Sequence, residues 1–171
     1  DADKSITKGF ISSSIGILTT LHTLEIINFR AGLTGTIPTE LSLLTQLDTV
    51  RLYLNNLEGP LPPLPATLRI GGISITNLNS TLPPIPPKME IFHISENNFV
   101  GTIGPIPASL TNFRIENNKF SGKLLIPSTT TFTDCIFYNA TNEQNCFEPC
   151  SLTACHCDKR PANCVAQTLP T

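Results

Sequence analysis

Apolar residues recur along this chain at a fixed spacing of 21 positions. The clearest column consists of Leu52, Ile73, Ile94, Ile115 and Ile136. The same shift relates Leu57 to Leu78, Phe99 and Phe120, and Leu61 to Leu82, Ile103 and Leu124. A fixed period of this length indicates stacked, similar turns, because a single turn cannot keep its apolar face away from water.

One earlier turn fits the pattern when its spacing is slightly longer than this period. The alignment places Leu24, Ile27 and Phe29 above Leu47, Val50 and Leu52. The array is therefore predicted to hold about six turns, from Leu18 to Tyr138. Within each turn, apolar and variable residues alternate as in a short strand with one face inward, so the stacked strands should form a parallel sheet.

A polar column accompanies the apolar ones where the chain leaves each strand. It reads Asn55, Thr76, Asn97, Asn118 and Asn139. A side-chain amide both donates and accepts, so it can satisfy backbone groups that the turn would otherwise bury unpaired. Threonine does only part of this, and the turn that holds Thr76 is therefore expected to be the loosest.

The segment Leu41–Pro62 resembles the plant-type extracellular leucine-rich repeat, L-xx-L-xx-L-xx-L-x-L-xx-N-x-L-x-G-x-[IL]-P. The later turns are similar to a shorter, proline-rich variant. The resemblance implies a solenoid with a concave parallel sheet and a convex side of polyproline II, 3-10 or short helical segments. On the convex side, a short helix capped by Thr39 is expected. The predicted boundaries are a flanking segment at 1–17, repeats at 18–138 and a cap at 139–171.

The predicted cap is rich in cysteine, and all six cysteines of the chain lie near its C-terminal end. They are Cys135, Cys146, Cys150, Cys155, Cys157 and Cys164. Zinc coordination is conceivable around Cys155-His156-Cys157, but three disulfides are the simpler interpretation, with 15 pairings open. No metal is therefore expected.

Several features predict a secreted, extracellular glycoprotein. Two N-x-[ST] sequons, at Asn79 and Asn139, are candidate glycosylation sites. The chain begins at Asp1 without an apolar leader, as expected of a processed chain. No apolar stretch is long enough for a membrane span, because Asn, Pro or Gly interrupts each one.

Charge and motifs argue against nucleic-acid binding and against catalysis. The formal net charge is −2, and no basic run exists to meet a phosphate backbone. The three histidines have no nucleophile or carboxylate at a catalytic spacing, and no glycine-rich phosphate loop is present. The protein is predicted to be a non-enzyme without a cofactor.

The period also assigns three columns of outward-facing strand positions. The first contains Asn28, Arg51, Gly72, His93 and Arg114; the second contains Arg30, Tyr53, Ser74, Ser95 and Glu116; the third contains Ile26, Thr49, Ile70, Ile91 and Asn112. Arginine, tyrosine and histidine beside exposed isoleucines are typical of binding surfaces. The candidate ligand-binding residues are Arg30, Arg51, Tyr53, His93 and Arg114, although such positions can equally be ordinary solvent-facing residues.

Two functional hypotheses follow. The first is a module that recognises a protein or carbohydrate ligand through the concave face, as the resemblance to polygalacturonase inhibitors and receptor ectodomains implies. The second is a structural subunit that assembles head to tail into an extracellular filament, because the N-terminal end has no cysteine-bearing cap and a non-closing contact propagates.

Overall fold

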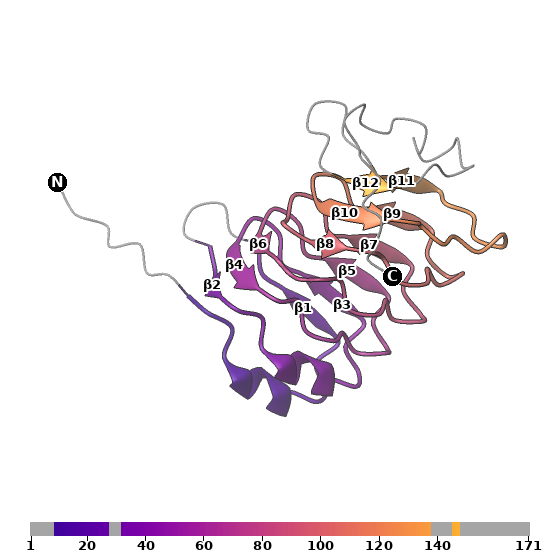
Figure 1. Cartoon of the computed structure of the whole chain (residues 1–171). Helices are drawn as coiled ribbons and strands as arrows, with labels where there is room; N and C mark the ends of the chain where they lie inside the picture. Colours follow the sequence, from indigo (N-terminus) through magenta and orange to yellow (C-terminus); the bar gives the residue numbers. More distant parts are fainter. Residues whose placement is uncertain (1–8, 28–31, 138–144, 148–171) are drawn as a thin grey trace, which may run out of the picture.

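The computed structural model describes residues 9–27, 32–137 and 145–147, which form a stacked series of similar turns (Figure 1). Six short parallel strands form one sheet in the order β1-β3-β5-β7-β9-β11. Their bounds are Thr23–Glu25, Thr49–Arg51, Ile70–Gly72, Ile91–His93, Asn112–Arg114 and Asp134–Ile136. The predicted leucine-rich-repeat solenoid with a parallel sheet is thus confirmed.

Two smaller sheets form where each turn leaves the large sheet. One has the order β2-β4-β6, with bounds Thr34–Gly35, Asn56–Gly59 and Asn77–Leu78. The other has the order β12-β10-β8, with bounds Cys146–Phe147, Lys119–Gly122 and Val100–Gly101. All of these pairings are parallel. Each turn therefore hydrogen-bonds to its neighbours along two sides.

Two 3-10 helices lie side by side on the convex side of the first turns (Figure 1). They are η1, Ser13–Ile17, and η2, Thr39–Leu43. The helix predicted near Thr39 exists, but Thr39 is its first residue, and Pro38 is the N-cap without a side-chain hydrogen bond. Proline at this position sets an extended approach to the helix. No helix in the described ranges has the length and apolar character that crossing a membrane requires.

The core is built from side chains that stack from turn to turn. The predicted spine of Leu57, Leu78, Phe99 and Phe120 is fully buried. The rings of Phe99 and Phe120 are stacked with centroids 5.9 Å apart, and Phe147 extends the stack beyond Phe120 at 6.4 Å. Each such burial stabilises the fold by about 1.5–3 kcal/mol, and this contribution exists only when the adjacent turn is present.

The column of asparagines forms a ladder of hydrogen bonds inside the solenoid. Asn118 Nδ2 donates to Ile94 O (2.8 Å) and Ile115 O (3.1 Å), and its Oδ1 accepts from Phe99 N (3.1 Å). Each asparagine thus ties its own turn to the preceding one. The hydroxyl of Thr76 donates to Asn97 Oδ1.

In the last turn, the ladder position is taken by a residue outside the predicted column. Asn145 Oδ1 accepts from Phe120 N (3.1 Å), and its Nδ2 donates to Ile115 O (2.7 Å) and Phe137 O (2.9 Å). Asn139, which the period assigned to this position, lies outside the described residues. More residues therefore separate Asn145 from Asn118 than separate Asn118 from Asn97.

The structure corrects the predicted register of the first turn. Leu24 pairs with Val50, whereas the predicted alignment placed it above Leu47. Leu24 is buried, and Ile27, the predicted partner of Val50, is 39% exposed. Apolar residues recur at every third position in both segments. Sliding one segment by three residues along the other therefore still pairs most apolar residues with apolar residues. The predicted neighbours of Arg51 and Thr49 were therefore wrong: they are Glu25 and Thr23, in place of Asn28 and Ile26.

The last strand is displaced by one position relative to the predicted column. Cys135 pairs with Phe113 and Ile136 with Arg114, so this turn is one position longer than the period. Phe137, which is fully buried, takes the inward position that the period assigned to Ile136. Cys135 is disulfide-bonded. The side chains of the other five cysteines lie outside the part of the chain that is described.

The backbone turns sharply just before each ladder position. Leu54, Ile75, Glu96 and Asn117 all have positive φ angles, between 54° and 58°. Side chains with a Cβ atom rarely adopt this left-handed conformation, and it is most costly for a β-branched residue such as Ile75. The packing and hydrogen bonds of the stacked turns therefore hold this strained conformation in place.

Candidate ligand-binding face

The outward side chains of the six-stranded sheet form the concave face. The pairing aligns Thr23, Thr49, Ile70, Ile91, Asn112 and Asp134 in one column, and Glu25, Arg51, Gly72, His93, Arg114 and Ile136 in the next. Arg51, His93 and Arg114 thus lie on one face, as the sequence predicted, while Arg30 lies outside the described residues. Tyr53 follows shortly after β3.

Tyr53 occupies the centre of this face because the next turn has no side chain at residue 72. A Cβ atom at Gly72 would collide with the phenol oxygen of Tyr53, so the tyrosine ring lies across this glycine. Burial raises the pKa of the Tyr53 hydroxyl, which is therefore neutral. The partly exposed side chains of Ile70 and Ile91 lie in the neighbouring column. Together, Tyr53, Ile70, Ile91 and His93 form the central patch.

The arginines on this face already have carboxylate partners. Arg51 forms an ion pair with Glu25 at 3.2 Å, and Arg114 donates two hydrogen bonds to Asp134 at 2.6 and 2.9 Å. Such partly exposed pairs contribute little to stability, but they hold the guanidinium groups in fixed positions. A ligand would therefore meet paired charges on either side of the central patch.

A third arginine, Arg69, which was not among the predicted binding residues, links three consecutive turns where the strands of the large sheet begin. Arg69 donates to both oxygens of Glu90 at 2.8 and 2.9 Å and to Asp48 at 3.4 Å. The hydrogen bond from Arg69 lowers the pKa of the Glu90 carboxyl. Asp48, Arg69 and Glu90 follow one another at the repeat period with alternating charge, and this is the signal that could have identified the row.

The pKa of His93 is lowered, which favours the neutral ring, and a neighbouring side chain orients it. His93 Nε2 donates to Asn112 Oδ1 at 2.7 Å. Burial of the ring lowers the pKa of His93, while the hydrogen bond to Asn112 opposes this shift. The imidazole therefore presents an uncharged aromatic surface beside Ile91, and it adds to the apolar character of the central patch.

Glu116 brings a partly buried carboxyl group to the same face. Its Oε2 is buried and has no hydrogen-bond partner among the described residues. Burial raises the pKa of Glu116, a hydrogen bond to its own backbone lowers it, and the nearby carboxylate of Glu96 raises it. Arg114 lowers the pKa, but its guanidinium is engaged by Asp134. The net result is a raised pKa for the Glu116 carboxyl, because the effect of burial is the largest.

Candidate sites off this face are only partly described. Asn79, the first glycosylation candidate, is exposed next to the end of β6, where the small sheet meets solvent. Asn139, the second candidate, lies outside the described residues. Within the described ranges, no three side chains of His, Cys, Asp or Glu are grouped closely enough to hold a metal ion.

Comparison with solved structures identifies the architecture. A TDR receptor superposes with a TM-score of 0.61 and 26% identity, and the match covers 82% of this chain and 29% of the receptor. The chain has the leucine-rich-repeat fold. A pollen receptor kinase 3 matches this leucine-rich-repeat solenoid with a TM-score of 0.66 and 22% identity over 85% of this chain and 73% of the kinase structure.

A third leucine-rich-repeat structure is the plant peptide hormone receptor RGFR1 in complex with RGF2. Its TM-score is 0.59 at 20% identity, and the match covers 82% of this chain and 27% of the receptor. The chain thus spans less than a third of the length of the TDR and RGFR1 receptors. No protein-family model matches the sequence, and no curated protein matches it either.

Proposed function

We propose that this protein is a non-catalytic extracellular module that recognises a peptide or protein ligand through the concave face. The observation that carries the proposal is the central patch of Tyr53, Ile70, Ile91 and His93. Aromatic and aliphatic side chains at the centre of a surface supply most of the binding energy of an interface. The patch lies among charges that are already paired, so a ligand can cover it without leaving arginines unpartnered.

The geometry favours an extended peptide over a carbohydrate. The patch runs across adjacent strands and follows the solenoid axis, so a chain laid along it would contact side chains from three successive turns. One solved structure with this fold is a peptide hormone receptor in complex with RGF2, so the fold is compatible with this ligand class. An extracellular location is part of the proposal, because several proteins with this fold are plant receptors. N-linked glycans at Asn79 and Asn139 are also part of it, on the strength of the two sequons.

The test uses a peptide library displayed on phage and selected against the purified protein. Selected peptides should bind the wild type and lose at least about tenfold in affinity to a Tyr53→Ala/His93→Ala variant, which removes two anchors. Thr81→Ala/Thr102→Ala is the matched control, because both threonines are exposed on the flank of the solenoid. Peptides that lose affinity only for the control variant would place the binding surface elsewhere.

A further inference from the structure

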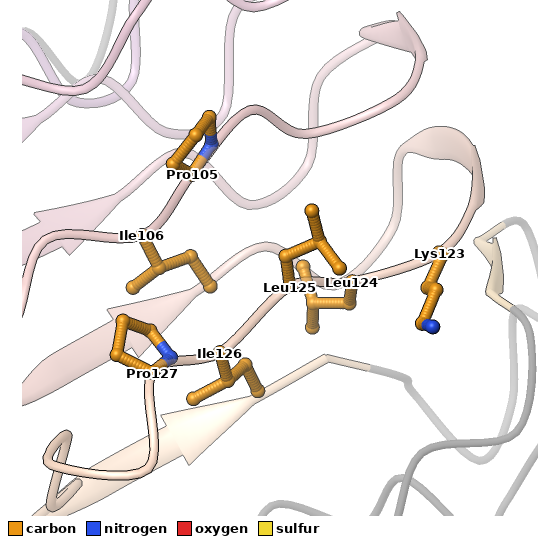
Figure 2. Close-up of a pocket in the computed structure, with 7 residues that line it drawn as sticks. All are labelled: Pro105, Ile106, Lys123, Leu124, Leu125, Ile126 and Pro127. Carbon is orange, nitrogen blue, oxygen red and sulfur yellow. The ribbon is translucent and has the colours of Figure 1, made fainter.

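A second apolar surface lies on the opposite, convex side of the solenoid. It is a groove of about 370 Å³ between the connections of two successive turns (Figure 2). Its walls are Pro105 and Ile106 on one side and Leu124, Leu125 and Ile126 on the other, with Lys123 at one end. Leu125 is 53% exposed. We call these six residues the convex groove.

Around the groove, two adjacent turns depart from the proline-rich pattern. Gly104 has no side chain, and a Cβ atom there would meet nothing within 4 Å. In the next turn, Leu125 occupies the stretch where earlier turns carry proline pairs, such as Pro83-Pro84. The groove is thereby lined by an exposed leucine where an earlier turn carries proline. Ile106 and Leu124 are almost fully buried, so Leu125 is the main apolar side chain that the groove exposes.

A complementary surface lies on the two 3-10 helices. Ile17 is 78% exposed, Leu43 is 56% exposed and Leu18 is 48% exposed. Gly16 allows η1 to approach η2 closely, because a Cβ at residue 16 would come within 3.3 Å of Leu43 Cδ1 and 2.9 Å of Glu40 Cβ. We call Ile17, Leu18, Leu43 and Glu40 the helical patch. It presents three apolar side chains beside one carboxylate.

The two surfaces carry opposite charges that have no ion-pair partner among the described residues. Glu40 accepts a hydrogen bond from the neighbouring Thr39 hydroxyl at 3.3 Å, and neither Glu40 nor Lys123 takes part in an ion pair within the described ranges. Because stacked strands lie about 4.8 Å apart, three to five turns separate the two surfaces by roughly 15–25 Å. One chain therefore cannot seat its own patch in its own groove.

We propose that two copies of this chain pair through their convex sides in an antiparallel dimer. The helical patch of each copy fills the convex groove of the other, with Leu43 and Ile17 against Leu125 and with Glu40 beside Lys123. A two-fold axis makes both contacts equivalent, so one complementary pair of surfaces is used twice. The dimer is closed, in contrast to a head-to-tail filament, and leaves both concave faces open to ligand.

Sedimentation velocity over a concentration series tests the proposal. The wild type is expected to shift from monomer to dimer, and Leu125→Asp should weaken the dimer by at least about tenfold, because each substitution acts at two contacts. Val100→Asp is the matched control, since Val100 is 40% exposed on the flank of the solenoid. Circular dichroism would establish that both variants remain folded.

Charge reversal provides the second arm. Glu40→Lys and Lys123→Glu should each weaken the dimer, and the double variant should restore it. A wild type that stays monomeric at the highest concentration overturns the dimer itself. A dimer that tolerates Leu125→Asp, or that grows into larger species, overturns the assignment of these surfaces. Neither result bears on peptide binding by the central patch, which the phage selection measures separately.

Discussion

The asparagine ladder makes the sharpest prediction about stability. Asn97 Nδ2 donates to Ile73 O (2.8 Å), Ser95 O (3.1 Å) and Ile94 O (3.2 Å), and Oδ1 accepts from Leu78 N (3.3 Å). The Asn97→Ala substitution removes all of these bonds from a side chain that is almost fully buried. At least two backbone groups, Leu78 N–H and Ile73 C=O, lose this partner.

The magnitude follows from the penalty for buried polar groups. Each one left without a partner costs about 1–3 kcal/mol, so the two together predict a loss of about 2–6 kcal/mol. For a chain of this size, that corresponds to a fall in Tm on the order of 10 °C. Urea unfolding followed by circular dichroism measures the free energy directly.

The adjacent residue gives a matched control. Asn98 is partly exposed, and its Oδ1 accepts from Lys119 Nζ at 2.9 Å near solvent. Asn98→Ala should change stability by no more than about 0.5 kcal/mol. If the two variants unfold at the same urea concentration, the amide bonds of the ladder do not stabilise the solenoid as argued.

Four further substitutions test other features. Ile75→Asn should stabilise the protein by about 1 kcal/mol, because asparagine tolerates the left-handed backbone, and Asn117→Ile should do the reverse; unchanged urea midpoints would refute both. Glu116→Gln should stabilise the fold at neutral pH but not below pH about 4. The pKa of Glu116 is raised in the folded state, so the protonated carboxyl stabilises the fold at low pH, and this stability is lost as the pH rises through the folded pKa. A pH-independent effect of the substitution contradicts this. Gly71→Ala should cost about 1–3 kcal/mol, because its Cβ would lie 2.8 Å from the ring of Phe92, and an unchanged thermal midpoint would show that the ring moves freely.

The sequence predicted the fold because its strongest signal is periodic. When residues recur at one fixed interval, equivalent residues of successive turns stack, which predicts the parallel sheet and the buried spine. The alternation of side chains then predicts which residues of each strand face inward and which face outward. Leu57, Leu78, Phe99 and Phe120 could therefore be placed correctly without coordinates. The period also brought Arg51, His93 and Arg114 to one face.

The errors occur where the period changes. In the first turn, the spacing of apolar residues gave two nearly equal alignments, and the wrong one moved Asn28 to the position that Glu25 occupies. In the last turn, one extra residue put Phe137 inward where Ile136 was expected. The sequence pattern could not reveal these lengths, because loops tolerate insertions at little free-energy cost.

The candidate site was predicted less completely than the fold. Residue type alone selected arginines as binding residues, but their carboxylate partners come from other turns and depend on the exact register. The position of Tyr53 depends on the absence of a side chain at Gly72, which belongs to the following turn. Contacts of this kind depend on how the turns stack in space, so they cannot be predicted from a column of aligned residues alone.

The direction of the ladder bonds bears on how such a protein can change its length over evolutionary time. Asn97 and Asn118 each donate to a carbonyl of the turn before their own, so the pattern of bonds repeats from one internal step to the next. Duplication or loss of one complete repeat unit leaves every remaining bond with a partner of the same kind. Gene segments that encode whole turns can thus be gained or deleted in the interior, whereas a gain of a few residues inside a turn disturbs both neighbours.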